Sequence, residues 1–97
     1  MTFDEFKASL SDDAPPAGVG APLRALWLDA ANDWDGAHDA LQGQPDGNGS
    51  AWVHAYLHRV EGDLSNAAGW YRRARKPASS APLPQEWEEI ARALLQD

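Results

Sequence analysis

The sequence contains no cysteine. Disulfide bonds, thiolate metal sites and cysteine nucleophiles are therefore excluded, and a reducing cytoplasmic location is the expectation that fits this composition. No apolar run approaches the roughly 20 residues that a membrane span requires. The first residues also lack the basic start and apolar stretch of a secretory signal. We expect a soluble, cytoplasmic chain with no membrane partner.

Positive charge is scarce as well. Eight Lys and Arg residues oppose 15 Asp and Glu residues, which gives a formal net charge of −7. This balance disfavours non-specific nucleic-acid binding, because affinity for phosphate comes largely from accumulated cations. The first half of the chain is acidic, whereas most cations come later, at Arg59, Arg72, Arg73, Arg75 and Lys76. We expect a dipolar surface and no nucleic-acid partner.

Motifs for nucleophilic or phosphate chemistry are also missing. The serines fall in predicted caps, turns and linkers, and none stands in a GxSxG context. The stretch GVGAP at 18–22 lacks the strand and the lysine of a phosphate-binding loop. The sequence therefore predicts a protein that is not an enzyme, and it assigns no catalytic residue, metal ion or cofactor.

Apolar residues at helical spacing are abundant. Hydrophobic residues make up 43% of the chain and include five tryptophans, whose burial offsets the loss of chain entropy on folding. Their periodicity predicts an all-α fold of five to six helices in a single domain, 1–97. The predicted elements are an N-terminal helix at 2–10, a helical hairpin at 22–42, a second hairpin at 51–76 and a C-terminal helix at 84–96.

Local signals place the helix ends. Thr2 and Glu5 have the spacing of a capping box. Asp33 and Asp63 follow sharp turns and are the predicted N-caps of the second helix of each hairpin. Ser50 closes a loop that is rich in helix breakers, and we expect it to be the N-cap of the helix that follows.

The two hairpins are related by a shift of 30 residues. The matched positions are small or apolar, as expected where hairpins pack together. The pairs are Leu23 with Val53, Ala25 with Ala55, Asp33 with Asp63, Trp34 with Leu64, Ala37 with Ala67, and Leu41 with Tyr71. The sequence therefore predicts two repeats of one helical hairpin, with the first and last helices as their caps.

The second hairpin resembles a tetratricopeptide or Sel1-like repeat. The small, glycine, small, aromatic, small order of that family is matched by Ala55, Gly62-Asp63, Ala67, Tyr71 and Ala74. The resemblance covers 51–76 well and 23–42 weakly, and it implies a protein or peptide partner. The string WVHAYLHRVEGDLSNAAGWYRRA is also similar to a family of short bacterial proteins, which supports the architecture without implying a function.

Two of the three histidines, His54 and His58, are four residues apart in the stretch AWVHAYLHR. Side chains at this spacing project in parallel from a helix, so a metal or enzyme site is one interpretation, with His38 or Glu61 as a further ligand. No HExxH motif is present. The favoured interpretation is a buried clamp between the hairpins, since a buried imidazole needs hydrogen-bond partners. The candidate partners are Asp33, Asp39 and Glu61.

The favoured function is a non-enzymatic interaction module. We expect most tryptophans to be core anchors, and Trp52, which lies off the main stripe of its helix, is the best candidate for a binding groove. That groove is predicted near Trp52, Tyr56 and Arg59, and it would bind a protein or peptide. The alternatives are the metal or enzyme site and a structural homo-oligomer that pairs through exposed apolar hairpin faces. The chain would be a monomer or a homodimer.

The basic run at the end of the second hairpin has two interpretations. The favoured one is stabilisation of a helix C-terminus together with pairing to acidic residues of the chain. The alternative is a small anion site for a carboxylate or a phosphate. The residues are Arg72, Arg73, Arg75 and Lys76.

Overall fold

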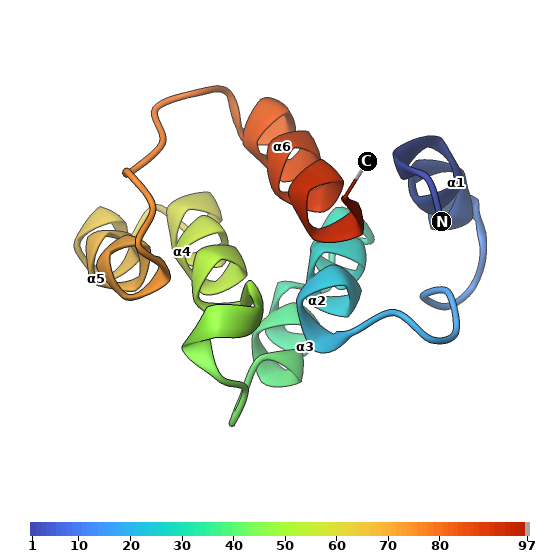
Figure 1. Ribbon diagram of the computed structural model, residues 1–97, viewed down its shortest axis with the longest axis horizontal. Helices are drawn as coiled ribbons and strands as arrows, with labels where there is room; N and C mark the ends of the chain where they lie inside the picture. The colour runs from blue at the N-terminus through green and yellow to red at the C-terminus, as the bar shows by residue number, and fades with distance from the viewer. Residues whose placement is uncertain (97) are drawn as a thin grey trace.

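The computed structural model describes residues 1–96, and its regular elements are all helical, which confirms the predicted fold class (Figure 1). None of the described helices combines the length and apolar character needed to cross a membrane. The α-helices are α1 (Phe3–Ala8), α2 (Ala21–Ala30), α3 (Trp34–Ala40), α4 (Ser50–Val60), α5 (Leu64–Ala74) and α6 (Leu83–Leu95). Two short 3₁₀ turns, η1 (Ser9–Ser11) and η2 (Asp46–Asn48), lie in the connections.

The pairs α2/α3 and α4/α5 form two helical hairpins whose turns share one geometry. Asn32 and Gly62 both adopt left-handed backbone conformations, with φ of 66° and 86°. In the residue after each, the backbone N–H of Asp33 or Asp63 donates to a carbonyl five residues earlier. Each aspartate side chain then accepts a hydrogen bond from the backbone N–H three residues on. The predicted N-caps are confirmed, and the offset of 30 residues recurs in the backbone.

The predicted N-cap at Ser50 is wrong. The N-cap is Gly49, in a left-handed conformation with φ of 97°, and Ser50 is the first residue inside α4. A Cβ at position 49 would lie 2.4 Å from Leu94 Cδ2 of α6, so the close approach of α6 also favours glycine there. The Ser50 hydroxyl consequently does not cap the helix.

The other predicted helix ends are close to the observed ones. The Thr2–Glu5 capping box is present. The N-terminal helix is shorter than the predicted 2–10, because α1 ends at Ala8 and continues as a 3₁₀ turn. The C-terminal helix begins one residue before the predicted 84 and ends one residue before 96.

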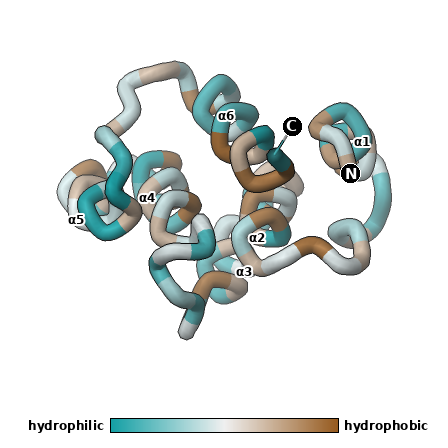
Figure 2. The backbone as a smooth tube through the Cα atoms, in the orientation of Figure 1, coloured by the Kyte–Doolittle hydropathy of each residue, from teal (hydrophilic) through white to brown (hydrophobic). Residues whose placement is uncertain are grey.

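The core lies between α2, α4 and α6. Leu26, Leu57 and Ile90, one from each helix, have no exposed surface. Complete burial of side chains of this size contributes about 1.5–3 kcal/mol each. Figure 2 shows the apolar side of α6 turned toward the rest of the bundle. The core therefore joins the C-terminal helix to the first helix of each hairpin.

The terminal helices cover this core instead of extending the repeat beyond α5. α6 packs on both α2 and α4, and the indole Nε1 of Trp87 donates to the carbonyl of Leu26 at 2.9 Å. α1 packs on α6, where Phe6 stacks on Trp87 and Phe3 meets it edge-on. The face that the first helices of both hairpins share is thus occupied by the chain's own C-terminal helix.

A buried polar network fixes α6 to the second hairpin. Glu86, which is 2% exposed, accepts hydrogen bonds from the Tyr71 hydroxyl at 2.6 and 2.9 Å and from Arg59 Nη1 at 3.0 Å. Arg59 also donates to the carbonyl of Ala81 in the connection before α6. Within residues 1–96, the hydrogen bonds that the Glu86 side chain accepts therefore come from α4 and α5.

Candidate functional site

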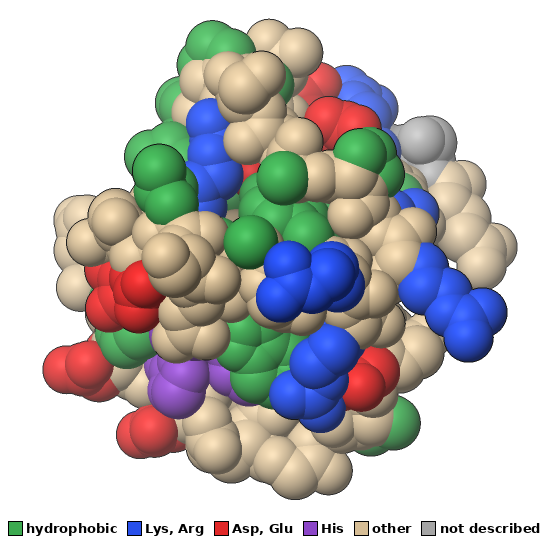
Figure 3. Space-filling view, turned by 90° about the vertical axis from the view of Figure 1, so that its left-hand side faces the viewer, with side chains coloured by type: hydrophobic (Ala, Val, Ile, Leu, Met, Phe, Trp, Pro, Cys, Tyr) green, Lys and Arg blue, Asp and Glu red, His purple; other side chains and the backbone are tan. Residues whose placement is uncertain are grey.

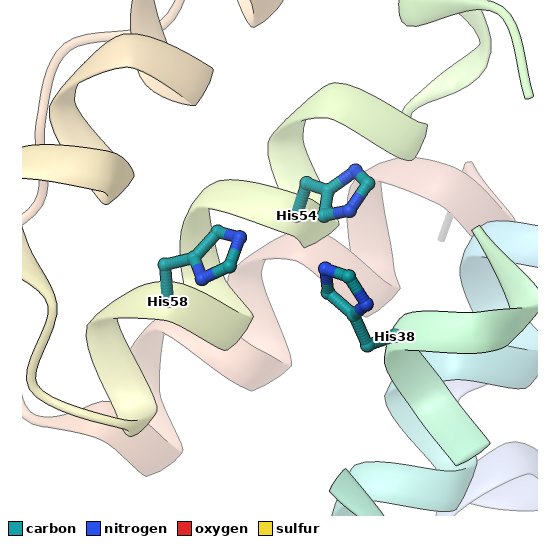
Figure 4. Close-up of side chains that lie close together, drawn as sticks. All are labelled: His38, His54 and His58. Carbon is teal, nitrogen blue, oxygen red and sulfur yellow. The ribbon is translucent and has the colours of Figure 1, made fainter. Parts of the chain in front are cut away.

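The three histidines meet in one place, although they come from two helices. His38 projects from α3 toward His54 and His58 of α4, and in Figure 4 each ring turns one nitrogen toward the space that they share. One ligand nitrogen from each residue lies within 4.8 Å of the others. His54 and His58 are 5% and 6% exposed, whereas His38 is half-buried at the surface.

Two tryptophans flank the histidine rings. Trp34 stacks on His38 with a centroid distance of 5.0 Å, and its indole Nε1 donates to the carbonyl of Leu57 at 2.8 Å. Trp70 stacks on His54 with a centroid distance of 3.8 Å. These contacts restrict rotation of both imidazoles, so that the ring nitrogens keep facing one another.

The outward nitrogens of two rings have partners of their own. His58 Nδ1 lies 2.6 Å from Glu61 Oε1, and His38 Nδ1 lies 3.2 Å from Gln42 Nε2. The Asn66 amide lies 3.4 to 3.5 Å from both nitrogens of His58, a longer contact. The Glu61 carboxylate accepts from His58 Nδ1–H, so Nε2 is the nitrogen that His58 can offer to an ion. As placed, the Gln42 amide nitrogen donates to His38 Nδ1, which puts the proton of a neutral His38 on Nε2.

The predicted clamp, in which hydrogen bonds from the histidines join the hairpins, is only partly present. Of its candidate partners, Glu61 does contact His58. Asp33 instead caps α3, and the exposed Asp39 makes no hydrogen bond to a histidine. The histidines do connect the hairpins, but they do so mainly through ring contacts between His38 and the two imidazoles of α4.

Burial and nearby positive charge set the protonation of His54. Its pKa is lowered from 6.5 to about 4, chiefly by burial and then by the neighbouring His38, His58 and Arg73. His54 is therefore neutral at pH 7, and the neutral imidazole is the form that binds a metal ion.

The histidines line an open cleft of about 670 Å³ between α3, α4 and α5. Arg73 stands at its rim, with Nε and Nη2 donating to the two carboxylate oxygens of Asp46 at 3.1 and 2.9 Å. The Arg73 guanidinium also lies 4.1 Å from the ring centroid of Trp70. Figure 3 shows histidine surface reaching solvent beside apolar side chains, with basic side chains to one side. The cleft has the volume of a small-molecule site.

Three of the four residues of the basic run share one cleft. Arg73, Arg75 and Lys76 line a second cleft near the C-terminal end of α6, and Arg73 also lines the histidine cleft. Lys76 Nζ lies 4.2 Å from the ring centroid of Trp52, and the exposed Arg72 lines neither cleft. The predicted pairing with the acidic first half is present between Arg73 and Asp46.

Trp52, Tyr56 and Arg59, near which the sequence predicted a groove, do not share one exposed surface. Tyr56 is 4% exposed in the core, and Arg59 is committed to the buried ion pair with Glu86. Trp52 is partly buried and lines the second cleft. α6 covers this face because its apolar side and Glu86 complement it.

The five tryptophans differ in burial. Trp27 and Trp87 are core anchors as predicted, whereas Trp34, Trp52 and Trp70 are only partly buried. Among the described residues, the large apolar side chains that are exposed are Met1 and Leu64.

Sequence reasoning missed the tryptophans and the ion pair beside the histidines. Trp34 precedes His38 by four residues, a spacing that places both on one helix face and that could have revealed the stack. Trp70 and Arg73 reach the cleft from α5, and Asp46 reaches it from η2. Their positions depend on how the elements pack, for which the sequence carries no local signal.

Searches against protein-family models, curated proteins and solved structures found no match for this chain.

Proposed function

We propose that this protein binds one divalent transition-metal ion through His38, His54 and His58. The observation that carries the proposal is the convergence of three imidazoles from two helices, with ligand nitrogens within 4.8 Å of one another. The chain has only three histidines. All of them are in this cluster.

The donor set favours zinc, copper or nickel over calcium or magnesium, because imidazole nitrogen suits the former and oxygen donors suit the latter. Three protein ligands would leave a further coordination position open toward the cleft, as in catalytic zinc sites. The contact of Glu61 with His58 Nδ1 matches the outer hydrogen bond that orients most metal-binding histidines.

Metal binding requires the three imidazole rings to move slightly closer together. Zn–N bonds of ~2.1 Å at tetrahedral angles place the nitrogens about 3.4 Å apart, compared with separations of up to 4.8 Å among these atoms. His38 is the half-buried member and can supply most of this movement. A flip of the Gln42 amide would let its oxygen accept from His38 Nδ1–H, the tautomer that leaves Nε2 free to bind.

From the sequence alone, a metal site was a less favoured interpretation than a structural clamp or an interaction module. The covered face near Tyr56 and Arg59 is the reason that we do not assign a peptide groove there. The tetratricopeptide-like resemblance, with its protein or peptide partner, stays a prediction. So do the cytoplasmic location and the monomeric or homodimeric state.

The test is a titration of the full chain, purified without a histidine tag and freed of metal, with Co²⁺ and Zn²⁺. We expect one Co²⁺ per chain, visible ligand-field absorption and quenching of the fluorescence of Trp34 and Trp70, which stack on the ligands. Zinc at 100 times its Kd would stabilise the fold by about 2.7 kcal/mol.

The decisive variant is His38→Gln, because this residue is the least buried ligand and its loss disturbs the core least. We expect its Co²⁺ affinity to fall by more than the 10–100-fold typical of lost outer contacts, with unchanged helical circular dichroism. Glu89→Gln, at an exposed acid on α6, is the matched control and keeps wild-type affinity. Wild-type affinity in His38→Gln, or no stoichiometric Co²⁺ binding, would refute the proposal.

A further inference from the structure

The first turn of α4 carries unused hydrogen-bond donors next to the histidines. Ser50 is 2% exposed, and its hydroxyl oxygen has no hydrogen-bond partner among the described residues. The side chain lines the same cleft as His54 and His58. A buried polar group without a partner is costly, so its retention here calls for an acceptor or donor from a ligand.

The backbone of the same turn also has N–H groups without an acceptor in the described chain. α4 is 11 residues long, and its N-cap Gly49 supplies no side-chain hydrogen bond. The Ser50 N–H donates to Asn48 Oδ1, whereas the structure gives the N–H groups of Ala51 and Trp52 no acceptor within the described chain. Such amides at a helix N-terminus favour an anion through their direction and through the helix dipole.

Helical spacing connects these donors to the histidines. Ser50, His54 and His58 follow one another at intervals of four residues, so they lie along one face of α4. Neighbours on such a face have Cβ atoms about 5–6 Å apart. A ligand that contacts the first turn of α4 therefore lies within one helical turn of the His54 imidazole.

The charge of the cleft also permits an anion. Asp46, an acidic residue that lines the cleft, accepts two hydrogen bonds from Arg73. The guanidinium charge offsets that of the carboxylate. Arg73 stands over Trp70 at the mouth of the cleft. A divalent ion on the histidines would add two positive charges, and the Glu61 carboxylate beside His58 offsets only one of them.

We infer that the histidine cleft takes a small oxyanion, a carboxylate or a phosphate, which is held at the N-terminus of α4 by Ser50 and by the first-turn amides. The anion contacts use protein groups alone, whereas the second part of the inference, that one oxygen of the anion also binds the metal, rests on the proposed function. This assigns an oxyanion-bearing small molecule as the class of ligand for the site.

The anion site is tested on the full, metal-free chain by amide NMR. Methylphosphonate and acetate serve as the phosphate-like and carboxylate probes. We expect saturable shifts of the Ala51 and Trp52 amides, and the tighter probe identifies the preferred oxyanion. Ser50→Ala should weaken binding at least about tenfold, as for the loss of a hydrogen bond to a charged group. The control Ser65→Ala, at an exposed serine of α5, should leave binding unchanged.

The metal part has a separate readout. In the Co²⁺-loaded chain the bound probe should change the ligand-field spectrum, while Ser50→Ala keeps wild-type Co²⁺ affinity. Amides that do not respond to either probe, or equal probe affinity in Ser50→Ala, would overturn the oxyanion site. A Co²⁺ spectrum that ignores the bound probe would overturn the shared coordination. Responsive amides in a chain that binds no Co²⁺ would leave the oxyanion site standing and refute the metal proposal.

Discussion

At the scale of single residues, the histidine cluster is organised by what each imidazole touches on its outer side. Glu61 meets His58 at Nδ1, Gln42 meets His38 at Nδ1, and Trp70 covers the face of His54. These neighbours select the ring orientation before any ligand arrives, which reduces the conformational cost of binding. Glu61 is the charged member of this set, so it is the neighbour whose removal should be easiest to measure.

Replacing this carboxylate tests its role. Glu61→Gln keeps the shape of the side chain but removes the charge that fixes the tautomer and ring orientation of His58. We expect Co²⁺ affinity to fall by about 10–100-fold, with little change in helical content. The affinity is measured by competition with a chelator of known Kd.

Glu89→Gln again serves as the matched control, because Glu89 is also an exposed glutamate but lies on α6. If Glu61→Gln and Glu89→Gln had the same Co²⁺ affinity, Glu61 would have no orienting role and its contact with His58 would be incidental to metal binding.

At the scale of elements, α6 determines which surfaces remain available. It supplies Ile90 to the core, Trp87 to the carbonyl of Leu26 and Glu86 to the network with Arg59 and Tyr71. The face of the two hairpins that would otherwise be free is buried by these contacts. The histidine cleft lies between α3, α4 and α5 and is not covered by α6.

The ion pair of Arg59 with Glu86 should be critical for α6. In Arg59→Met, Glu86 would stay buried beside Tyr71 without a compensating cation, and we expect the free energy of unfolding to fall by about 3–5 kcal/mol. The measurement is urea unfolding followed by tryptophan fluorescence. Two partly exposed side chains form the comparison pair Arg92–Glu88, and Arg92→Met should cost no more than about 1 kcal/mol.

The double variant Arg59→Met with Glu86→Leu separates burial of a lone charge from loss of packing. It removes both charges, so it should be more stable than Arg59→Met alone. If the double variant were less stable than Arg59→Met, the ion pair itself would be net stabilising. The cost of Arg59→Met would then not come from a buried charge left without its partner.

At the scale of the whole molecule, the described chain forms a bundle around one main core, to which both terminal helices contribute. The chain's only two tyrosines report on the intactness of that bundle. Burial is the first cause that raises the pKa of both Tyr56 and Tyr71 well above 10.0, and the contact with Glu86 raises that of Tyr71 further. Both phenols should therefore stay protonated as long as the fold persists.

This predicts loss of stability in alkali. Above pH 10 the unfolded chain ionises its tyrosines while the folded chain keeps them protonated, so the free energy of unfolding falls as pH rises. Each tyrosine contributes about 1.4 kcal/mol per pH unit in that window. Tyrosinate absorbance should appear together with the loss of helical circular dichroism. In urea, both tyrosines should titrate near 10. Titration near 10 in the folded chain would contradict the burial of these phenols.

The helices and their turns could be predicted from the sequence, because they depend on local chemistry. Asp33 and Asp63 cap their helices through their own side chains, and Asn32 and Gly62 close the turns before them. The i and i+4 spacing placed His54 and His58 on one face of their helix, where a buried clamp was the favoured interpretation. Ser50 was the exception, since the position of the N-cap was decided by Gly49 and its contact with α6.

Which helix surfaces meet depends on how the whole chain packs. The packing of α3 against α4 brought His38 to the other two imidazoles, and η2 and α5 brought Asp46 and Arg73 beside them. It also placed α6 on the hairpin face where the sequence predicted a binding groove. These contacts join residues far apart in the chain, and they depend on complementary shape and charge across whole helices. Short sequence patterns describe one helix at a time, so they cannot select such partners.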